Sequence, residues 1–201
     1  MELLIARHGQ SVADIEHRYE GRADYPLTDL GREQAGKLAS WFIQNLTPEI
    51  IISSPLKRAS ETAELIGNAI GIKVQYNDAL MEMDSGLLGG MLRTEADIKY
   101  PMRPRMPHEQ VLGGESQLDF RFRAEKFWSE FVAEYAMDEN SPRVLLVSHG
   151  GMINMLFGCM LRLPISGDRS FRTNDTGLHF CKIDKSKVFI HFINRIDHLL
   201  T

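Results

Sequence analysis

The sequence predicts an α/β fold, a three-layer sandwich in which helices flank a mostly parallel central sheet. Short apolar runs at residues 3–6, 50–52 and 144–147 are typical of strands that are buried on both faces. Amphipathic helical stretches separate these runs, and that alternation favours a parallel sheet. Two further strands, expected at residues 178–183 and 188–193, flank a short turn, so we expect them to pair antiparallel.

Each expected helix has a local start or stop signal. Thr28 can cap a helix whose apolar positions recur at helical spacing from residue 30 onward. Pro55 suits the first turn of a second helix, and Gly71 suits its end. A long amphipathic helix over residues 117–135 and a shorter apolar one over about 152–161 complete the alternation.

The least regular part of the chain runs from about residue 84 to residue 116. Prolines interrupt it, so we expect a small cap insertion here, lying over the carboxyl ends of the strands. The whole chain, residues 1–201, is then a single domain that carries this insertion. Its basic side chains fit either a lid that contacts the substrate or a solvated loop, and they are Arg103, Arg105 and His108.

Composition excludes several classes of protein. The 201 residues are 43% hydrophobic with a net charge of −4, which argues against a general nucleic-acid or membrane-surface binder. Cys159 and Cys181 have no metal-ligand spacing, and no signal peptide or membrane span is visible, so a reduced cytoplasm is expected. No cofactor is predicted, and the sequence leaves open whether the chain forms a homo-oligomer.

Two of the expected strands end in a histidine that is followed by glycine. The first strand leads into Arg7-His8-Gly9, and a late strand leads into Ser148-His149-Gly150. The carboxyl ends of strands in open α/β sheets are where ligands bind. We therefore expect both histidines at one edge of the sheet.

Arginines and an acid complete a set of groups that suits phosphoryl transfer. Arg7 and Arg58 can bind a phosphate dianion while staying charged. A neutral imidazole at His8 can attack phosphorus, and a protonated His149 would bind the equatorial oxygens as negative charge builds. Glu82 is the best-placed acid to protonate the departing oxygen.

These residues resemble the motifs of the histidine phosphatase superfamily, the phosphoglycerate mutase-like proteins. The resemblance covers nearly the whole chain, in the family's order, and its main motifs are Arg7-His8-Gly9, Gly21-Arg22, Ser53-Ser54-Pro55-Leu56-Lys57-Arg58-Ala59, Leu80-Met81-Glu82, Gly114-Glu115-Ser116 and Ser148-His149-Gly150. It implies that His8 is the phosphorylated nucleophile and Glu82 the proton donor. It also implies a phosphate or substrate pocket that includes Arg7, Arg58, His149, Gly21, Arg22 and Gly150.

One position departs from the family pattern. Members commonly carry asparagine where this chain has Asp14, and that asparagine's amide contacts phosphate. A carboxylate beside a phosphate dianion is repulsive unless it is protonated, turned away or bridged by a cation. We therefore expect Asp14 near the site, with an effect on substrate charge and efficiency rather than on the type of reaction.

The resemblance favours a metal-independent phosphatase that hydrolyses phosphate monoesters of a small metabolite through phosphohistidine. Two alternatives remain open: a phosphomutase of the cofactor-dependent phosphoglycerate mutase type, and a non-catalytic protein that binds a phosphorylated ligand. A metal hydrolase fits less well, because arginines beside the histidines repel a divalent cation and no metal motif is present.

Overall fold

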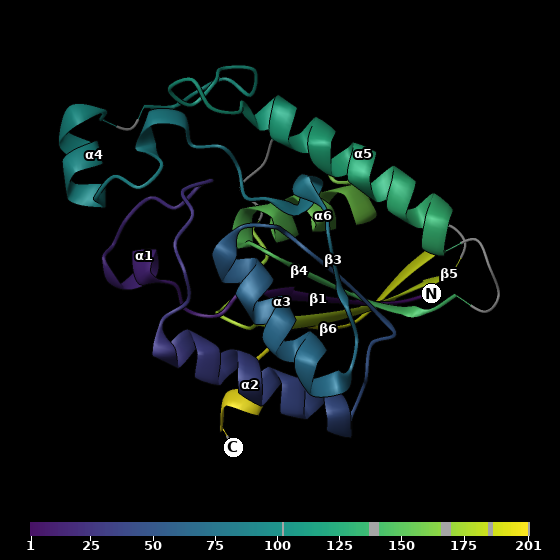
Figure 1. Ribbon diagram of the computed structural model, residues 1–201. Helices are drawn as coiled ribbons and strands as arrows, with labels where there is room; N and C mark the ends of the chain where they lie inside the picture. Colours follow the sequence, from purple (N-terminus) through teal and green to yellow (C-terminus); the bar gives the residue numbers. More distant parts are fainter. Residues whose placement is uncertain (102, 137–140, 166–169, 185–186, 201) are drawn as a thin grey trace.

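The structure is a computed structural model that describes residues 1–101, 103–136, 141–165, 170–184 and 187–200 (Figure 1). The short turn expected between the last two strands includes residues 185–186, which lie outside the described residues.

A mixed sheet forms the centre of the molecule. Within the described residues it has six strands in the order β3-β2-β4-β1-β5-β6. Strands β1 to β4 run parallel to one another, whereas β5 and β6 are antiparallel to their neighbours. The predicted α/β fold with a mostly parallel sheet is thus confirmed. The strands are β1 (Glu2–Arg7), β2 (Ile50–Ser53), β3 (Val74–Tyr76), β4 (Arg143–Ser148), β5 (Leu178–Asp184) and β6 (Lys187–Arg195).

Helices cover both faces of the sheet and make the outer layers of the sandwich. Figure 1 shows α2 and α3 on one side, with α5 and α6 on the other, and each pair packs on its own apolar cluster. The helices are α1 (Val12–Ile15), α2 (Asp29–Gln44), α3 (Lys57–Ile70), α4 (Arg93–Lys99), α5 (Gln117–Tyr135) and α6 (Gly150–Met160), with short 3-10 turns at η1 (Asp78–Leu80), η2 (Gly86–Leu88) and η3 (Asp197–Leu200).

The strand register brings the two histidine motifs together. Arg7 pairs with Ser148 between β1 and β4, and Ser53 pairs with Val147 between β2 and β4. The residue after each of these strands therefore leaves the sheet at one common edge. The inner residues of β1 and β4 are buried on both faces, which explains their continuous apolar runs.

The helix ends agree closely with their sequence signals. The Thr28 hydroxyl accepts a hydrogen bond from the Gly31 amide at 3.0 Å and caps α2, while Gly71 ends α3 in the left-handed conformation. Pro55 differs, because it precedes α3 instead of lying in its first turn. Helix α6 begins at Gly150, two residues earlier than expected, since it starts directly after the histidine.

Residues 84–116 form the irregular segment, and they are more ordered than the prolines suggest. They include η2 and α4, and an isolated bridge joins Arg18 to Leu92. The Gly90 amide also donates to the Tyr19 carbonyl at 2.7 Å, so this segment is tied to the loop that follows β1. In Figure 1 it lies at the end of the molecule next to α1. No helix in the described part of the chain is long and apolar enough to span a membrane.

Candidate active site

His8 is the first residue beyond β1 and is almost completely buried. Its backbone amide donates to the Ser148 carbonyl at 3.0 Å, which fixes the strand end. Gly9 then passes so close to α2 that an added Cβ would lie 2.5 Å from the Gly31 carbonyl oxygen. Glycine is therefore required after the histidine, because only a residue without a side chain fits that approach.

The imidazole of His8 is held as a neutral tautomer in which one nitrogen keeps its lone pair. Nδ1 lies 2.7 Å from the Gly9 carbonyl oxygen, which can only accept, so we assign the proton to Nδ1. Arg58 Nε donates to Nε2 at 3.3 Å, which requires a free lone pair there. Burial, together with the Arg58 and Arg7 guanidiniums, holds the pKa of His8 well below its usual value.

Arg58 lies in the first turns of α3, and its side chain is fully buried. While Nε faces His8, the two terminal nitrogens donate to the carbonyl oxygens of Ala23 at 3.0 Å and Gly21 at 2.9 Å. The guanidinium thus holds the loop after β1 against α3. The loop carbonyls in turn hold the positive charge beside His8 Nε2.

Arg7 supplies a second guanidinium to the same region. Its terminal nitrogens contact the Thr173 carbonyl at 3.1 Å, the Asp14 carboxylate at 3.4 Å and the Asp175 carboxylate at 3.3 Å. Its Nε is buried and has no hydrogen-bond partner among the described residues. A buried N–H without a partner is costly, so this donor is available to a bound anion.

His149 caps the start of α6 and lies beside His8, with ring centroids 5.1 Å apart. Its Nε2 is 2.8 Å from the Ser54 hydroxyl, which also accepts the Leu56 amide at 3.3 Å. We assign the Ser54 hydroxyl as the donor and Nε2 as the acceptor, so Nε2 carries no hydrogen. The hydrogen of the neutral ring is then on Nδ1, a buried N–H with no hydrogen-bond partner among the described residues. Burial and then Arg58 hold the pKa of His149 well below its usual value, so the protonated state expected from sequence needs a bound anion.

Glu82 follows η1 and is fixed by backbone amides. Oε1 accepts from Met83 at 2.8 Å, and Oε2 accepts from Gly151 in the first turn of α6 at 2.9 Å. An added Cβ at Gly151 would lie 2.3 Å from Oε1, so the second glycine after His149 makes room for this carboxyl group. Glu82 is thereby anchored next to the histidine at the start of α6.

Asp14 lies at the site but is bridged by a cation. Its Oδ2 accepts from the Ser11 amide at 2.8 Å in a capping box at the start of α1, and its Oδ1 faces Arg7. The repulsion expected from a carboxylate at this position is therefore offset by the Arg7 guanidinium. Asp14 also occupies a terminal N–H donor of Arg7 that could otherwise bind phosphate.

Replacing Asp14 with asparagine should therefore strengthen anion binding. The Asp14→Asn variant frees Arg7 from its ion pair and adds an amide donor, so we expect KM for a phosphate monoester to fall by roughly three- to tenfold. Steady-state kinetics with one aryl phosphate measure the change. Asp29→Asn, on the exposed first turn of α2, is the control. A rise in KM would show that Asp14 contacts the substrate favourably.

The remaining residues implied by the resemblance lie around this centre. Gly21 offers its carbonyl to Arg58, and Gly150 is the first residue of α6. Arg22 binds Glu115 at 3.1 Å and so links the loop after β1 to the end of the irregular segment. Within the described chain, no hydrogen bond or ion pair joins Arg103, Arg105 or His108 of that segment to the site. Arg103 pairs instead with Glu109.

Sequence reasoning missed three participants. Glu20 approaches both His8 and Arg58, Ser54 contacts His149, and Arg123 donates to the Glu82 carbonyl at 3.1 Å. Ser54 lies within a motif quoted above and Arg123 lies in α5, but nothing in their spacing indicates a hydrogen bond to the site. Glu20 lies in a loop, where residue spacing does not predict side-chain direction.

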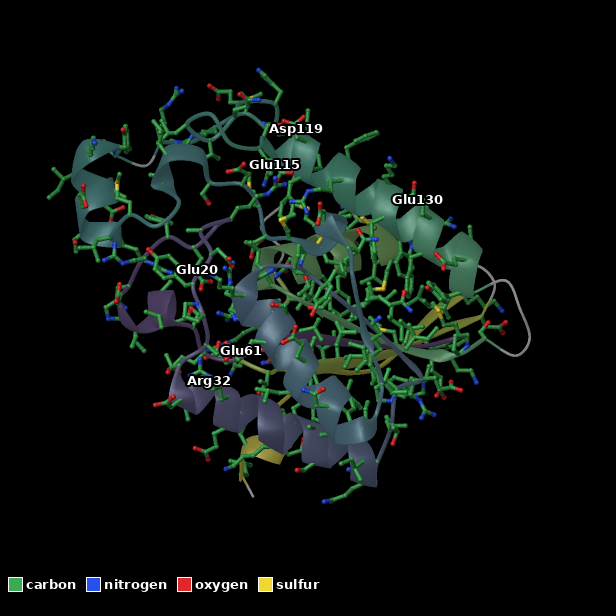
Figure 2. All side chains as sticks on the ribbon, in the orientation of Figure 1. Glu20, Arg32, Glu61, Glu115, Asp119 and Glu130 are labelled. Carbon is green, nitrogen blue, oxygen red and sulfur yellow. The ribbon has the colours of Figure 1, made fainter. Side chains whose placement is uncertain are left out.

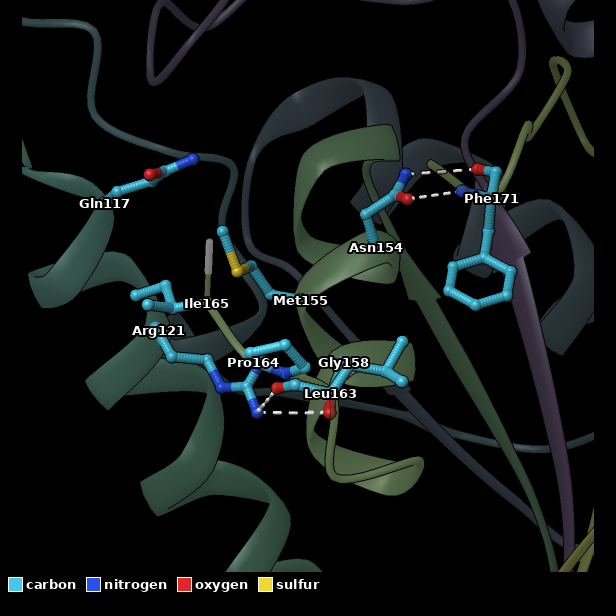
Figure 3. A pocket seen from close by; sticks show the side chains of 9 residues that line it. All are labelled: Gln117, Arg121, Asn154, Met155, Gly158, Leu163, Pro164, Ile165 and Phe171. Atoms are coloured by element: carbon cyan, nitrogen blue, oxygen red, sulfur yellow. Dashed lines mark hydrogen bonds between the residues drawn. The ribbon is translucent and has the colours of Figure 1, made fainter. Parts of the chain in front are cut away.

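Other features of the surface do not belong to the site. Figure 3 shows a pocket of about 100 Å³ between α5 and α6 that is lined by Arg121, Asn154 and Phe171, among others. Arg121 donates there to the carbonyls of Gly158 and Leu163, so its charge is already bound by the protein. In the part of the chain that the structure describes, no group of three or more His, Cys, Asp or Glu side chains is arranged to hold a metal ion.

Comparison with known proteins identifies the class of protein that carries this site. The model of the histidine phosphatase superfamily, branch 1, matches residues 3–196, so the chain belongs to that superfamily. It is a phosphatase of that superfamily.

Individual relatives support the same conclusion. Glucosyl-3-phosphoglycerate phosphatase of Mycobacterium tuberculosis is 33% identical over 172 residues, which cover 82% of this chain and 77% of the relative. Phosphoserine phosphatase 1 of Hydrogenobacter thermophilus is 30% identical over 207 residues, covering 99% and 94%. A solved structure of the mycobacterial glucosyl-3-phosphoglycerate phosphatase in complex with VO3 has a TM-score of 0.82 at 27% identity, covering 96% of this chain and 98% of that one.

Proposed function

We propose that this phosphatase hydrolyses monoesters through a phosphohistidine at His8, without a metal ion. The observation that carries the proposal is the state of that imidazole: Nδ1 is bound to the Gly9 carbonyl, and Nε2 has its lone pair beside Arg58. A neutral, buried nitrogen next to fixed positive charge is suited to attack a phosphoryl group that carries negative charge.

In the first step Nε2 attacks phosphorus, and the bond between phosphorus and the ester oxygen breaks. Arg58 Nε and the unpartnered Arg7 Nε supply donors to the phosphoryl oxygens. His149 supplies a third donor through Nδ1, because Ser54 holds its Nε2. These donors do not need to reorganise as charge develops, which is the main source of electrostatic catalysis.

Glu82 serves as the proton donor in this scheme. Protonated, it gives its proton to the departing oxygen; ionised, it then takes a proton from the water that attacks phosphorus. The second step breaks the P–N bond, returns the lone pair to Nε2 and releases inorganic phosphate. The backbone donors Met83 and Gly151 fix the carboxyl group for both steps.

The role of Glu82 makes the effect of its removal depend on the leaving group. Glu82→Gln cannot donate a proton, so phosphorylation by an alkyl phosphate should slow by about 10²–10⁴-fold, and by a nitrophenyl phosphate much less. Rapid-mixing kinetics with both esters measure the difference, and Glu64→Gln on α3 is the control. Equal losses with the two esters would assign the proton to another group.

The substrate class follows from the relatives and the irregular segment. The two relatives named above act on glucosyl-3-phosphoglycerate and phosphoserine, both small metabolites, which supports a small polar leaving group. We propose that residues 84–116 are a cap within a single domain over residues 1–201. This segment contacts Arg22 and Tyr19, which belong to the loop that Arg58 binds. These contacts support the role of a cap.

A rapid quench into alkali tests the proposed function. Mixing the protein with a ³²P-labelled monoester in chelator should give a labelled phosphoprotein that is labile in acid and stable in base. Labelled inorganic phosphate should then accumulate. Loss of the labelled protein in chelator, with recovery on adding one divalent metal, would reject the metal-independent mechanism.

A further inference from the structure

Glu20 is a carboxyl group at the reactive nitrogen that the mechanism above does not use. Its Oε2 lies 3.8 Å from His8 Nε2, and its Oε1 lies 3.5 Å from Arg58 Nε. Only 16% of its side chain is exposed. Figure 2 shows it on the loop after β1, beside the start of α3.

A count of hydrogens around Ser11 shows which group holds a proton. The Ser11 hydroxyl contacts two carboxyl groups, Asp14 Oδ2 at 2.9 Å and Glu20 Oε1, but it has only one hydrogen to donate. Asp14 is the ionised partner, because it also accepts the Ser11 amide and faces Arg7. Ser11 then has no hydrogen left for Glu20. The two form a hydrogen bond when Glu20 is protonated and donates to the Ser11 hydroxyl oxygen.

The charges that face Glu20 act in both directions. Burial is the largest effect and raises its pKa, and Asp14 adds to that rise. Arg58 and Arg7 oppose it, and so would a hydrogen bond that Ser11 donated to an ionised Glu20. The net shift of the Glu20 pKa is upward, in agreement with the hydrogen count.

A phosphoryl group that reacts with His8 must come into contact with Glu20. Reacting atoms approach to about 3–3.5 Å before bond formation. Glu20 Oε2 is 3.8 Å from the same nitrogen, so a phosphoryl oxygen and this carboxyl oxygen become neighbours. Two oxygens that both carry negative charge repel, whereas a protonated carboxyl group donates a hydrogen bond.

We propose that Glu20 is a phosphoryl-binding acid, which in its neutral form donates a hydrogen bond to the phosphoryl group at His8 and in its ionised form excludes that group. The inference rests on the proposed function, since it takes His8 as the place of reaction. When the anion arrives, the Glu20 proton is shared with a phosphoryl oxygen instead of with Ser11. Ionised Glu20 would instead pair with Arg58 and keep the guanidinium from the substrate.

The proposal has a defined sign with pH. Above the pKa of Glu20, the native protein must take up one proton to bind the anion, so its affinity falls. Glu20→Gln has a donor amide and no ionisation, so it does not carry this penalty. The ratio of the two dissociation constants should therefore grow by about tenfold per pH unit above that pKa and level off below it.

Calorimetric titration with inorganic phosphate from pH 5 to 8.5 tests this without turnover. Repeating the titration in buffers of different ionisation enthalpy counts the protons taken up. We expect the native protein and the control Glu16→Gln, which is exposed in the same loop, to take up about one proton more than Glu20→Gln at high pH. The ionisation of free phosphate is common to all three proteins and cancels.

A ratio that stays constant across this range would overturn the proposal. The dissociation constants of Glu20→Ala and Glu20→Gln must keep a constant ratio to each other across this range, because both variants lack an ionisable group. Glu20→Ala can therefore replace the glutamine variant if that variant folds poorly. The phosphoprotein assay described above reports on His8 separately. A labelled phosphoprotein with a constant ratio would reject the role of Glu20 and leave the proposed function intact.

Discussion

Replacing His8 with alanine should abolish phosphatase activity and the labelled phosphoprotein together. The substitution removes the nitrogen that accepts a hydrogen bond from Arg58 Nε, and loss of a covalent nucleophile typically lowers kcat by on the order of 10⁴–10⁶. Steady-state phosphate release and labelling with an alkaline quench measure the two effects on the same preparation. His8→Asn, which keeps a polar side chain at the strand end, should be as inactive as the alanine variant.

The matched control for His8 is His191→Ala. His191 lies exposed on β6 and stacks on Phe180, away from the sheet edge that carries the site. We expect its activity and labelling to stay near those of the native protein. A labelled phosphoprotein that persists in His8→Ala would assign the nucleophile to another residue.

Arg58 should have the second largest effect, and two substitutions separate its charge from its geometry. Arg58→Lys keeps a positive charge but cannot reach His8, Gly21 and Ala23 with one planar fork. Arg58→Gln also removes the charge. We expect kcat/KM to fall by about 10²–10³-fold in the lysine variant and further in the glutamine variant.

The pH profile distinguishes the two Arg58 variants. Arg58 is one cause of the lowered pKa of His8, after burial, so its loss lets that pKa rise. The acid limb of kcat/KM should therefore move to higher pH in Arg58→Gln and stay nearer the native position in Arg58→Lys. Arg32→Gln, which breaks an exposed ion pair with Glu61 seen in Figure 2, is the control. Unchanged acid limbs in both Arg58 variants would mean that this limb does not report His8.

Strong local patterns allowed most of the fold to be predicted. Strands β1 and β4 are buried on both faces, and such burial leaves continuous apolar runs in the sequence. Strand β3 gives a weak signal, since it has three residues at the edge of the sheet and two of them are exposed. Helix α4 is not predicted, because it is short, is followed at once by a stretch rich in proline and is positioned by contacts with the distant loop at Tyr19.

The candidate site could be located from sequence only in part. His8 and His149 are visible because each follows a buried strand, and the register of adjacent strands brings them to one edge. Their protonation is not visible, because it depends on burial and on contacts such as the one between His149 and Ser54. Glu20 is invisible for a similar reason: the direction of a loop side chain depends on tertiary contacts.

The position of β1 in the sheet has a consequence for how the chain folds. Strand β1 pairs only with β4 and β5 within the described residues, and both belong to the last third of the sequence. Contacts of such high sequence separation slow folding, and an unpaired apolar strand is prone to aggregate until its partners exist. During synthesis β2 and β3 can pair first, since they are close in sequence. The catalytic edge is therefore assembled late, when β4 inserts between β2 and β1 and completes the central part of the sheet.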